Sequence, residues 1–254
     1  MTDALLARHS PADRVAFGSS GERSAADLLR DAAAVANALP DKTAARPLAL
    51  MGVRRDVYAC TAALLGAWSR GYEVLVPPAD ATREGFLRMA QRADVGAVLH
   101  DTASSAGLPI PYILDNAAPE QRLSDLTCAQ EGVLHFAALE AAEAEPALRV
   151  TGSQLLREAA VLGRSLALPE RAAYACSLQV STRYAWAAGV FWPLLSGGSV
   201  LRDDPRNTTW AEQAARGTRA SPRDAREPSL LAIDGPPSTI APARAAEQTT
   251  GWIE

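Results

Sequence analysis

Short apolar runs alternate with longer helical patterns along residues 14–201. The runs are rich in valine, leucine and alanine and are bounded by glycine or proline, which is typical of buried strands. We predict strands at residues 14–17, 47–52, 73–78, 95–100, 132–136, 174–178 and 199–201, with a weaker one at 113–115.

Between these runs, apolar residues recur at helical spacing. Ser24, followed three residues later by Asp27, is close to a capping box and begins one helix. Gly71 is placed to end another as its first residue beyond the cap. We predict helices at residues 24–39, 56–68, 82–93 and 184–195, and one that begins at Thr151 or Ser153 and ends at Ala167.

A strand, helix, strand order with short connections is typical of βαβ units. The predicted fold class is therefore α/β, with a mainly parallel twisted sheet or sheets and helices on both faces. We expect one domain at residues 1–202.

The composition changes after Arg202. Residues 203–254 are rich in proline and arginine and have few large aliphatic side chains, so burial there offsets little of the entropy lost on ordering. We predict an irregular or disordered tail, compatible with a short strand at residues 230–233. An alternative is that residues 203–254 are not in the native reading frame.

Composition excludes several classes of function. The net charge of −4 is mild and no basic face stands out, so nucleic acid is not an expected partner. The three cysteines are far apart and form no CxxC pair, which argues against a metal site or a disulfide framework. No apolar run reaches the roughly 18–20 residues of a membrane span, and the start lacks the pattern of a signal peptide. We expect a cytoplasmic protein.

Three segments, taken in order, resemble the AMP-binding, adenylate-forming enzymes of the acyl- and aryl-CoA ligase superfamily. Residues 24–39 resemble the family's opening helix, and residues 47–53 with 63–77 resemble its "V-A-L…A-x-L-G-x-x-x-A-G-A-V-x-V-P" segment. Residues 189–200 resemble "G-x-L-x-P-L-L-x-G-A-x-V", the most specific match. The resemblance covers residues 4–202 and implies the fold of the N-terminal subdomains of acyl-CoA synthetases.

The resemblance implies an enzyme that joins a carboxylic acid to AMP and passes the acyl group to a thiol, using ATP, Mg and CoA, in fatty acid or polyketide metabolism. Nothing after Asp203 resembles the family's later motifs or the domain that carries its catalytic lysine. Lys42, the only lysine in the chain, precedes a predicted strand and does not replace that residue. We therefore expect a truncated relative with no catalytic or cofactor-binding residues and no bound cofactor.

The family's phosphate loop follows the strand that ends here at Phe136. Glycine, hydroxyl groups and a lysine suit such a loop, because backbone N–H groups and positive charge hold phosphate oxygens. Residues 137–147 contain none of these and carry Glu140, Glu143 and Glu145 instead. We interpret them as a solvated helical loop and expect that the chain does not adenylate by itself.

The acyl-site motif "H-x-Y-G" of the family corresponds to Thr182, Arg183, Tyr184 and Ala185, of which only the tyrosine matches. The candidates for a substrate pocket are Thr182, Tyr184, Trp186 and Gly189. The alternative is that this aromatic stripe is ordinary core. Likewise, Thr151-Gly152-Ser153-Gln154-Leu155 resembles "T-H-x-x-L", with Gly152 where histidine is common.

Three hypotheses about the function of the chain remain open. The chain is either a degenerate enzyme, a non-catalytic acyl-binding or docking module that acts with an acyl carrier protein, or one half of a split ligase with a complementary half.

His9, His100 and His135 are scattered and lack a carboxylate or cysteine at ligand spacing, so we interpret them as structural.

Overall fold

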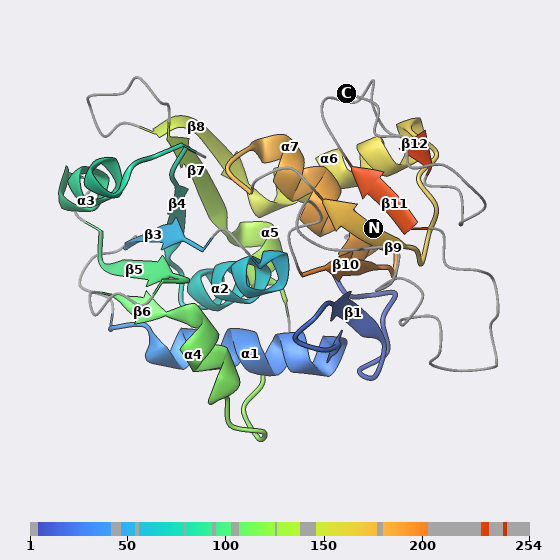
Figure 1. Cartoon of the computed structure of the whole chain (residues 1–254), viewed down its shortest axis with the longest axis horizontal. Helices are drawn as coiled ribbons and strands as arrows, with labels where there is room; N and C mark the ends of the chain where they lie inside the picture. Colours follow the sequence, from blue (N-terminus) through green and yellow to red (C-terminus); the bar gives the residue numbers. More distant parts are fainter. Residues whose placement is uncertain are drawn as a thin grey trace.

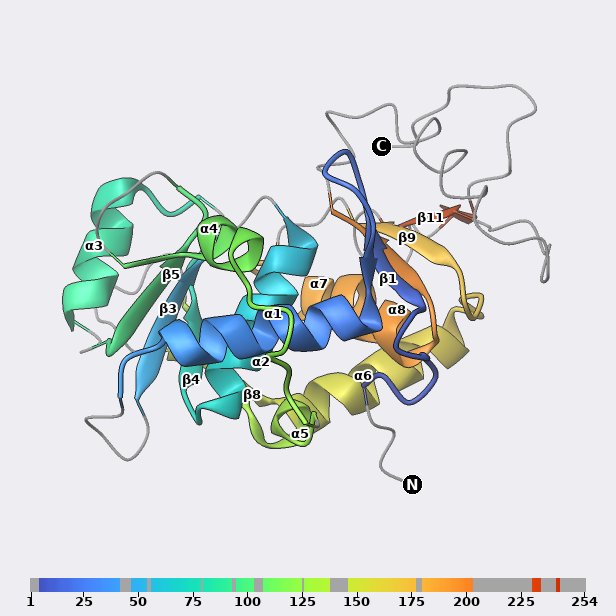
Figure 2. The same ribbon diagram turned by 90° about the horizontal axis from the view of Figure 1, so that it is seen from below.

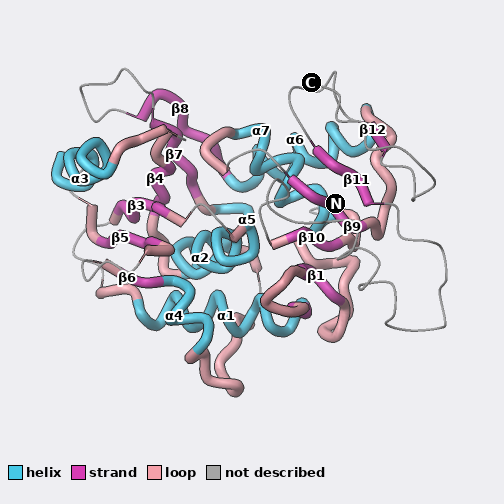
Figure 3. The backbone as a smooth tube through the Cα atoms, in the orientation of Figure 1, coloured by secondary structure: helices cyan, strands magenta, loops and turns pink. Residues whose placement is uncertain are grey.

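The computed structural model contains two six-stranded sheets with helices between and outside them (Figure 1). The structure describes residues 5–41, 47–53, 56–78, 80–92, 95–102, 107–124, 126–137, 146–176, 180–202, 230–233 and 241–242. Figure 3 shows the strands gathered in two separate groups.

Sheet A has the strand order β12-β11-β9-β10-β1-β2. The neighbours β11, β9, β10 and β1 are parallel, and the two-residue strands β2 and β12 add antiparallel edges. The strands are β1 (Arg14–Phe17), β2 (Arg23–Ser24), β9 (Ala173–Cys176), β10 (Ser199–Leu201), β11 (Leu230–Ile233) and β12 (Ala241–Pro242).

Sheet B has the order β6-β5-β3-β4-β7-β8 and is parallel from β6 to β7. Its last strand, β8, pairs antiparallel with β7 and forms an edge. The strands are β3 (Leu48–Gly52), β4 (Glu73–Val76), β5 (Ala97–His100), β6 (Leu108–Pro109), β7 (Val133–Ala137) and β8 (Pro146–Thr151).

The helices cover both faces of sheet B. Helix α2 contacts β4 of sheet B and β10 of sheet A, whereas α3 covers the outer face, where Phe86 lies against Gly52 (Figures 1 and 2). The expected α/β class, with mainly parallel sheets and helices on both faces, is confirmed. The helices are α1 (Ala25–Ala38), α2 (Val57–Ser69), α3 (Arg83–Arg92), α4 (Ile110–Asp115), α5 (Cys128–Glu131), α6 (Gly152–Ser165), α7 (Arg183–Trp186), η1 (Ala187–Phe191) and α8 (Trp192–Leu195).

The helix starts follow from local capping. Ser24 and Asp27 form the predicted capping box of α1, and Thr151 with Gln154 forms a second one at α6, which settles the choice between Thr151 and Ser153. Helix α2 is apolar on all sides, and its residues from Tyr58 to Trp68 are buried. Such a helix lies inside a core, and α2 does so between the two sheets.

The weak strand predicted at residues 113–115 is wrong, because this segment belongs to helix α4. Ile110 and Leu114, four residues apart, are both buried and so lie on one face of the helix. Pro111 is tolerated because it occupies the first turn, where the backbone N–H has no partner inside the helix.

The helical interpretation of residues 137–147 is also wrong at both ends. Ala137 ends β7 and pairs with Pro146, the first residue of β8. The two ends of this segment therefore belong to an antiparallel ladder, and residues 138–145 lie outside the described residues.

A strand at residues 230–233 is confirmed: β11 pairs in parallel with β9. Most of the other residues of the expected tail, 203–229, 234–240 and 243–254, lie outside the described part of the chain. The division into a domain at 1–202 and a tail at 203–254 stays a prediction.

Candidate functional site

The four predicted pocket residues lie on one helical segment. It follows the carboxyl end of β9 and runs through α7 and η1. In sheets of this kind, ligands bind beyond the carboxyl ends of the parallel strands. Thr182 is exposed, Tyr184 is half-buried, and Trp186 and Gly189 are buried. Thr182 thus lies at the surface, Trp186 and Gly189 lie in the core, and Tyr184 lies between these two environments.

Trp186 and Gly189 take part in core packing. The indole N–H of Trp186 donates to the carbonyl of Val180 at 2.7 Å, and no part of the side chain is exposed. A methyl group at position 189 would come within 2.4 Å of the Cys176 sulfur, so glycine allows η1 to lie directly against the end of β9. The pocket itself stays a prediction, with Thr182 and Tyr184 as its accessible members.

Thr182 fixes the start of α7. Its hydroxyl oxygen accepts a hydrogen bond from the backbone N–H of Ala185 at 3.2 Å, which is the N-cap geometry. The next residue, Arg183, forms an ion pair with Glu158 of α6. These two contacts hold the first turn of α7 in place beside α6.

The hydroxyl of Tyr184 is buried and, among the described residues, has no hydrogen-bond partner. Burial raises the pKa of this hydroxyl, and nearby Cys176 raises it further. The group is therefore a neutral phenol that can both donate and accept a hydrogen bond.

The helix changes its winding directly after Trp186. Residues Ala187–Phe191 form a π-helical segment, with α-helix before and after it. The sequence pattern predicted one continuous α-helix here. Such bulges are rare and frequently occur at functional sites.

The expected phosphate-loop segment connects β7 and β8 in sheet B. Its glutamates and Lys42 lie outside the described residues. Nothing in the structure therefore tests the expected loss of phosphate binding.

The glycine at position 152, where the motif that the sequence resembles commonly has histidine, has a physical explanation. A methyl group here would come within 1.9 Å of the carbonyl oxygen of Ala129 in α5. The backbone N–H of Gly152 also donates to the carbonyl of Gly132 at 2.8 Å. The close approach of α5 to the start of α6 thus excludes any larger side chain.

One histidine has a carboxylate partner that sequence spacing did not indicate. His135 on β7 contacts Glu73 on β4, and Arg149 on β8 lies 3.6 Å from the same carboxylate. The partners are far apart in the sequence, and only the pairing of β4 with β7 brings them together. The three strands lie side by side in sheet B.

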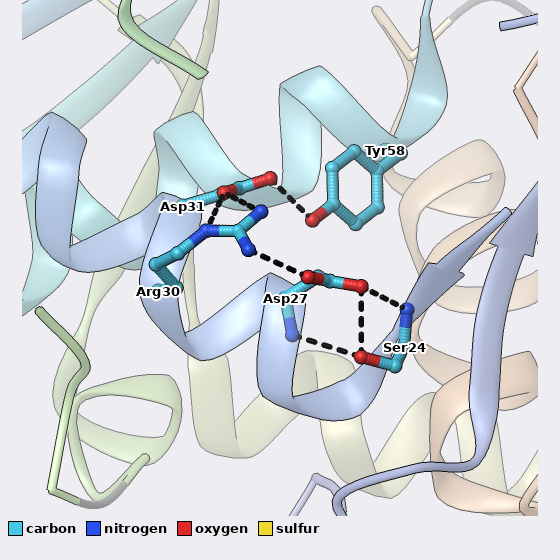
Figure 4. Close-up of polar contacts among 5 residues, drawn as sticks. All are labelled: Ser24, Asp27, Arg30, Asp31 and Tyr58. Atoms are coloured by element: carbon cyan, nitrogen blue, oxygen red, sulfur yellow. Dashed lines mark hydrogen bonds and ion pairs between the residues drawn. The ribbon is translucent and has the colours of Figure 1, made fainter. Parts of the chain in front are cut away.

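A second polar cluster joins α1 to α2 (Figure 4). The fully buried carboxylate of Asp31 accepts a hydrogen bond from the Tyr58 hydroxyl at 2.6 Å and two from Arg30 at 2.8 and 3.0 Å. Burial and the nearby Asp31 raise the pKa of Tyr58. The cluster is internally satisfied and acts as a connection between helices.

The end of β10 is tied to the start of α2. Arg202 donates to one carboxylate oxygen of Asp56 at 2.7 and 3.0 Å, and the other oxygen of Asp56 caps α2. The contact connects sheet A to the central helix.

Within the described ranges, no group of three or more His, Cys, Asp or Glu side chains is placed to hold a metal ion. Among the same residues, no helix has the length and apolar character needed to cross a membrane.

No protein-family model matches the chain, and no curated protein matches it. Solved structures do. A benzoate CoA ligase from Burkholderia xenovorans has a TM-score of 0.61 at 17% identity, over 84% of this chain and 46% of that chain. The NpsA N-terminal subdomain of Klebsiella oxytoca has a TM-score of 0.60 at 15% identity, over 84% of this chain and 57% of that chain.

A nonribosomal peptide synthetase has a TM-score of 0.61 at 18% identity, over 85% of this chain and 24% of that chain. The chain thus spans between about a quarter and three fifths of these proteins. At such identities the likeness establishes the fold, which is that of the N-terminal subdomains of adenylation enzymes and acyl- or aryl-CoA ligases.

Proposed function

We propose that this chain, which has the fold of the N-terminal part of adenylate-forming ligases, binds an acyl or aryl acid but does not adenylate it alone. The observation that carries the proposal is the connection between β7 and β8. Residues 138–145 contain three glutamates and neither glycine, hydroxyl group nor lysine. The phosphate loop of the family that the sequence resembles lies at this connection.

Electrostatics supports the loss of nucleotide binding. One carboxylate about 4 Å from a phosphate charge repels it by roughly 1 kcal/mol in water, and by more where solvent is excluded. A phosphate site needs inward N–H groups and positive charge, because each oxygen of the ligand is an acceptor. Three carboxylates in eight residues oppose that requirement.

The acid-binding part of the proposal rests on the α7 segment. Thr182 and Tyr184 lie beyond the carboxyl end of β9, which is where a ligand of a parallel sheet is expected. Two contacts position this segment: the N-cap hydrogen bond from the backbone N–H of Ala185 to the Thr182 hydroxyl oxygen, and the ion pair with Glu158. Positioned side chains beside a strand end are the elements from which a pocket is built.

An acyl carrier protein or a separate ligase half is the partner that we propose. One structural neighbour is an artificially fused adenylation–PCP di-domain from Klebsiella oxytoca, with a TM-score of 0.60 at 14% identity. A chain with this fold and no phosphate loop of its own would need another protein to supply the activated acyl group. The expected result is that an acyl-loaded carrier protein binds the chain more tightly than the unloaded carrier.

Isothermal titration with Mg·ATP tests the proposal. We expect no binding heat up to millimolar nucleotide for the natural chain. A variant with Glu140→Gly, Glu143→Ser and Glu145→Lys removes the repulsion and adds a donor, so we expect measurable binding to it. Micromolar binding of Mg·ATP to the natural chain would refute the proposal.

A further inference from the structure

One face of sheet A carries an apolar cluster of its own. The side chains of Phe17, Ala173, Ala175 and Leu201 are 2–5% exposed and form this cluster, which contains no residue of any described helix. The guanidinium of Arg14 lies 5.0 Å from the centre of the Phe17 ring and covers part of it. We call this side of the sheet its outer face. Sheet A therefore buries apolar side chains on the outer face as well as on the side that packs against helices.

The opposite, inner face of sheet A is covered by the helices that connect β9 to β10. Gly189 of η1 lies against Cys176 of β9, and Trp192 of α8 donates a hydrogen bond to Tyr174 of the same strand. These two residues of β9 alternate with the two alanines of the outer cluster, so they point to the other side of the sheet. The connection from β9 to β10 thus crosses the inner face.

The next connection belongs on the outer face. It runs from β10 to β11, which lie on opposite sides of β9 and are both parallel to it. A crossover between parallel strands is right-handed in about 98% of cases. The steps from β9 to β10 and from β10 to β11 run in opposite directions across the sheet, so right-handedness places their connections on opposite faces. The second connection is made by residues 203–229.

Sheet B contains the same pattern with a helix described in both connections. The chain passes from β3 through α2 to β4, and then back through α3 to β5, in a sheet with the order β5-β3-β4 at its centre. Helix α2 lies on the side that faces sheet A, and α3 covers the outer face of sheet B. In sheet A, the order β11-β9-β10 repeats this arrangement. Residues 203–229 therefore correspond in the topology to α3.

The sequence of this connection suits an apolar sheet face. Thr209, followed three residues later by Glu212, is a capping-box pattern. Trp210 is the only large apolar side chain of the connection, and two of the four residues of the outer cluster are alanines, which leave room for it. Four apolar residues recur after Thr209 at the spacing of one helix face: Trp210, Ala211, Ala214 and Ala215.

We propose that the outer face of sheet A is a docking surface for residues 203–229 of the same chain, with the side chain of Trp210 against the apolar cluster. The two ends of the segment select this occupant, since they are fixed at β10 and β11 on either side of β9. The segment is also long enough, because such a crossover takes about a dozen residues or more. Residues 203–233 then belong to the folded domain, and this face is not the one that binds a carrier protein or a ligase half.

Two single substitutions in the full chain test the inference. Ala214→Asp places a carboxylate on the apolar stripe, whereas Gln213→Asp, the matched control, places it on the other side of the same helical pattern. An unpaired charge is excluded from an apolar contact. We expect Ala214→Asp to lower the melting temperature by about 5–10 °C and Gln213→Asp by less than about 2 °C. Equal melting temperatures for the two variants would overturn the inference.

Cleavage by trypsin locates the effect in the segment itself. The bond after Arg216 should be cut slowly in the natural chain and in Gln213→Asp. It should be cut at least about tenfold faster in Ala214→Asp, because a loss of local stability raises the population of the open segment. Cleavage of the natural chain as fast as that of a synthetic peptide of residues 203–229 would show that the segment does not dock. This comparison decides the question even if Ala214→Asp does not fold.

The state of association separates this occupant from a second copy of the chain. A face covered by another molecule makes the melting temperature depend on concentration. We expect a melting temperature that is independent of protein concentration. A value that rises with concentration, together with rapid cleavage after Arg216, would assign the face to a second copy and overturn the inference. These measurements use no ligand, so their outcome is independent of the proposed function.

Discussion

Two helices end in the same hydrogen-bond pattern with different residues at its left-handed position. After α2, the N–H groups of Gly71 and Tyr72 donate back to the carbonyls of Trp68 and Ala67, and Gly71 has a φ of 72°. After α6, Ala167 occupies the equivalent position with a φ of 48°. A residue with a Cβ is strained in this conformation, whereas glycine is not.

We therefore expect exchanges at these two positions to have opposite signs. Gly71→Ala should lower the free energy of unfolding by about 1 kcal/mol, because it introduces strain. Ala167→Gly should raise it by about 0.5 kcal/mol, since relief of strain exceeds the added entropy of the unfolded chain. Urea denaturation of both variants checks the pair. A loss of stability in both would show that Ala167 is not strained.

At a second residue, Gly152, the sequence shows a departure from the motif that it resembles but not the reason for it. The reason is a contact with another helix, because an added methyl group would lie 1.9 Å from the carbonyl oxygen of Ala129. Gly152→Ala should therefore destabilise the fold by about 2–3 kcal/mol. Gly85→Ala is the matched control: its added methyl would meet only the Thr82 hydroxyl, at 3.4 Å. Similar melting temperatures for the two variants would contradict the packing argument.

The capping box at the start of helix α1 makes the stability of the fold depend on pH. The Asp27 carboxylate accepts hydrogen bonds from the Ser24 N–H and hydroxyl, both at 2.8 Å, and from Arg30 at 2.7 Å (Figure 4). Burial raises the pKa of Asp27, but the Ser24 hydrogen bonds and the Arg30 charge outweigh it, so the net pKa lies below 3.8. A lowered folded-state pKa contributes stability above the unfolded value, and this stability is lost as the pH falls through the folded one.

Asp27→Asn should consequently flatten the acid side of the stability profile. Melting temperatures from about pH 6 to about pH 3 should fall less for Asp27→Asn than for the natural chain, because the variant has no proton to take up. Ser24→Ala, which removes the N-cap, should cost about 1 kcal/mol at neutral pH. Parallel profiles for Asp27→Asn and the natural chain would show that Asp27 has no part in acid stability.

At the scale of elements, the sequence predicted the helices that have a regular apolar spacing and an N-cap residue. Helices α1, α2, α3 and α6 combine apolar spacing with Ser24, Asp56, Thr82 and Thr151 at their starts, and these residues identified them. Strand β8 was missed because its identity depends on pairing with β7, and alanine and glutamate upstream favour helix. The π-helical segment η1 contacts α6 and β9, and no local sequence pattern indicates its winding.

For the whole molecule, the sequence predicted the fold class, with mainly parallel strands, but not the order in which the strands lie in the sheets. Nothing in the spacing of the apolar runs indicated that they divide between two sheets. The strands β1 and β10 pair although most of the chain separates them. For the same reason the contact between Glu73 and His135 could not be found from sequence spacing. In the candidate site, Tyr184 was identified from a motif, whereas its unpaired hydroxyl required the structure.

Helix α2 lies between the two sheets and contacts both of them, so we expect it to couple their unfolding. One core cluster contains residues of both sheets, among them Val15 and Val200 of sheet A and Val74 of sheet B, together with the buried side of α2. Helices α1 and α2 approach closely at Gly66, where a methyl group would lie 2.6 Å from the carbonyl oxygen of Ala32. Displacing α2 at this point moves a surface on which both sheets pack.

Gly66→Ala should therefore weaken both sheets at once. We expect a loss of about 2–3 kcal/mol in the free energy of unfolding, because the close approach of the two helices leaves no room for the added methyl group. Tryptophan fluorescence reports on all five tryptophans, among them Trp68 beside sheet B and Trp192 beside sheet A. It should show one transition that coincides with that from far-ultraviolet circular dichroism. Two separate transitions would mean that each sheet unfolds with its own helices, and that α2 does not couple them.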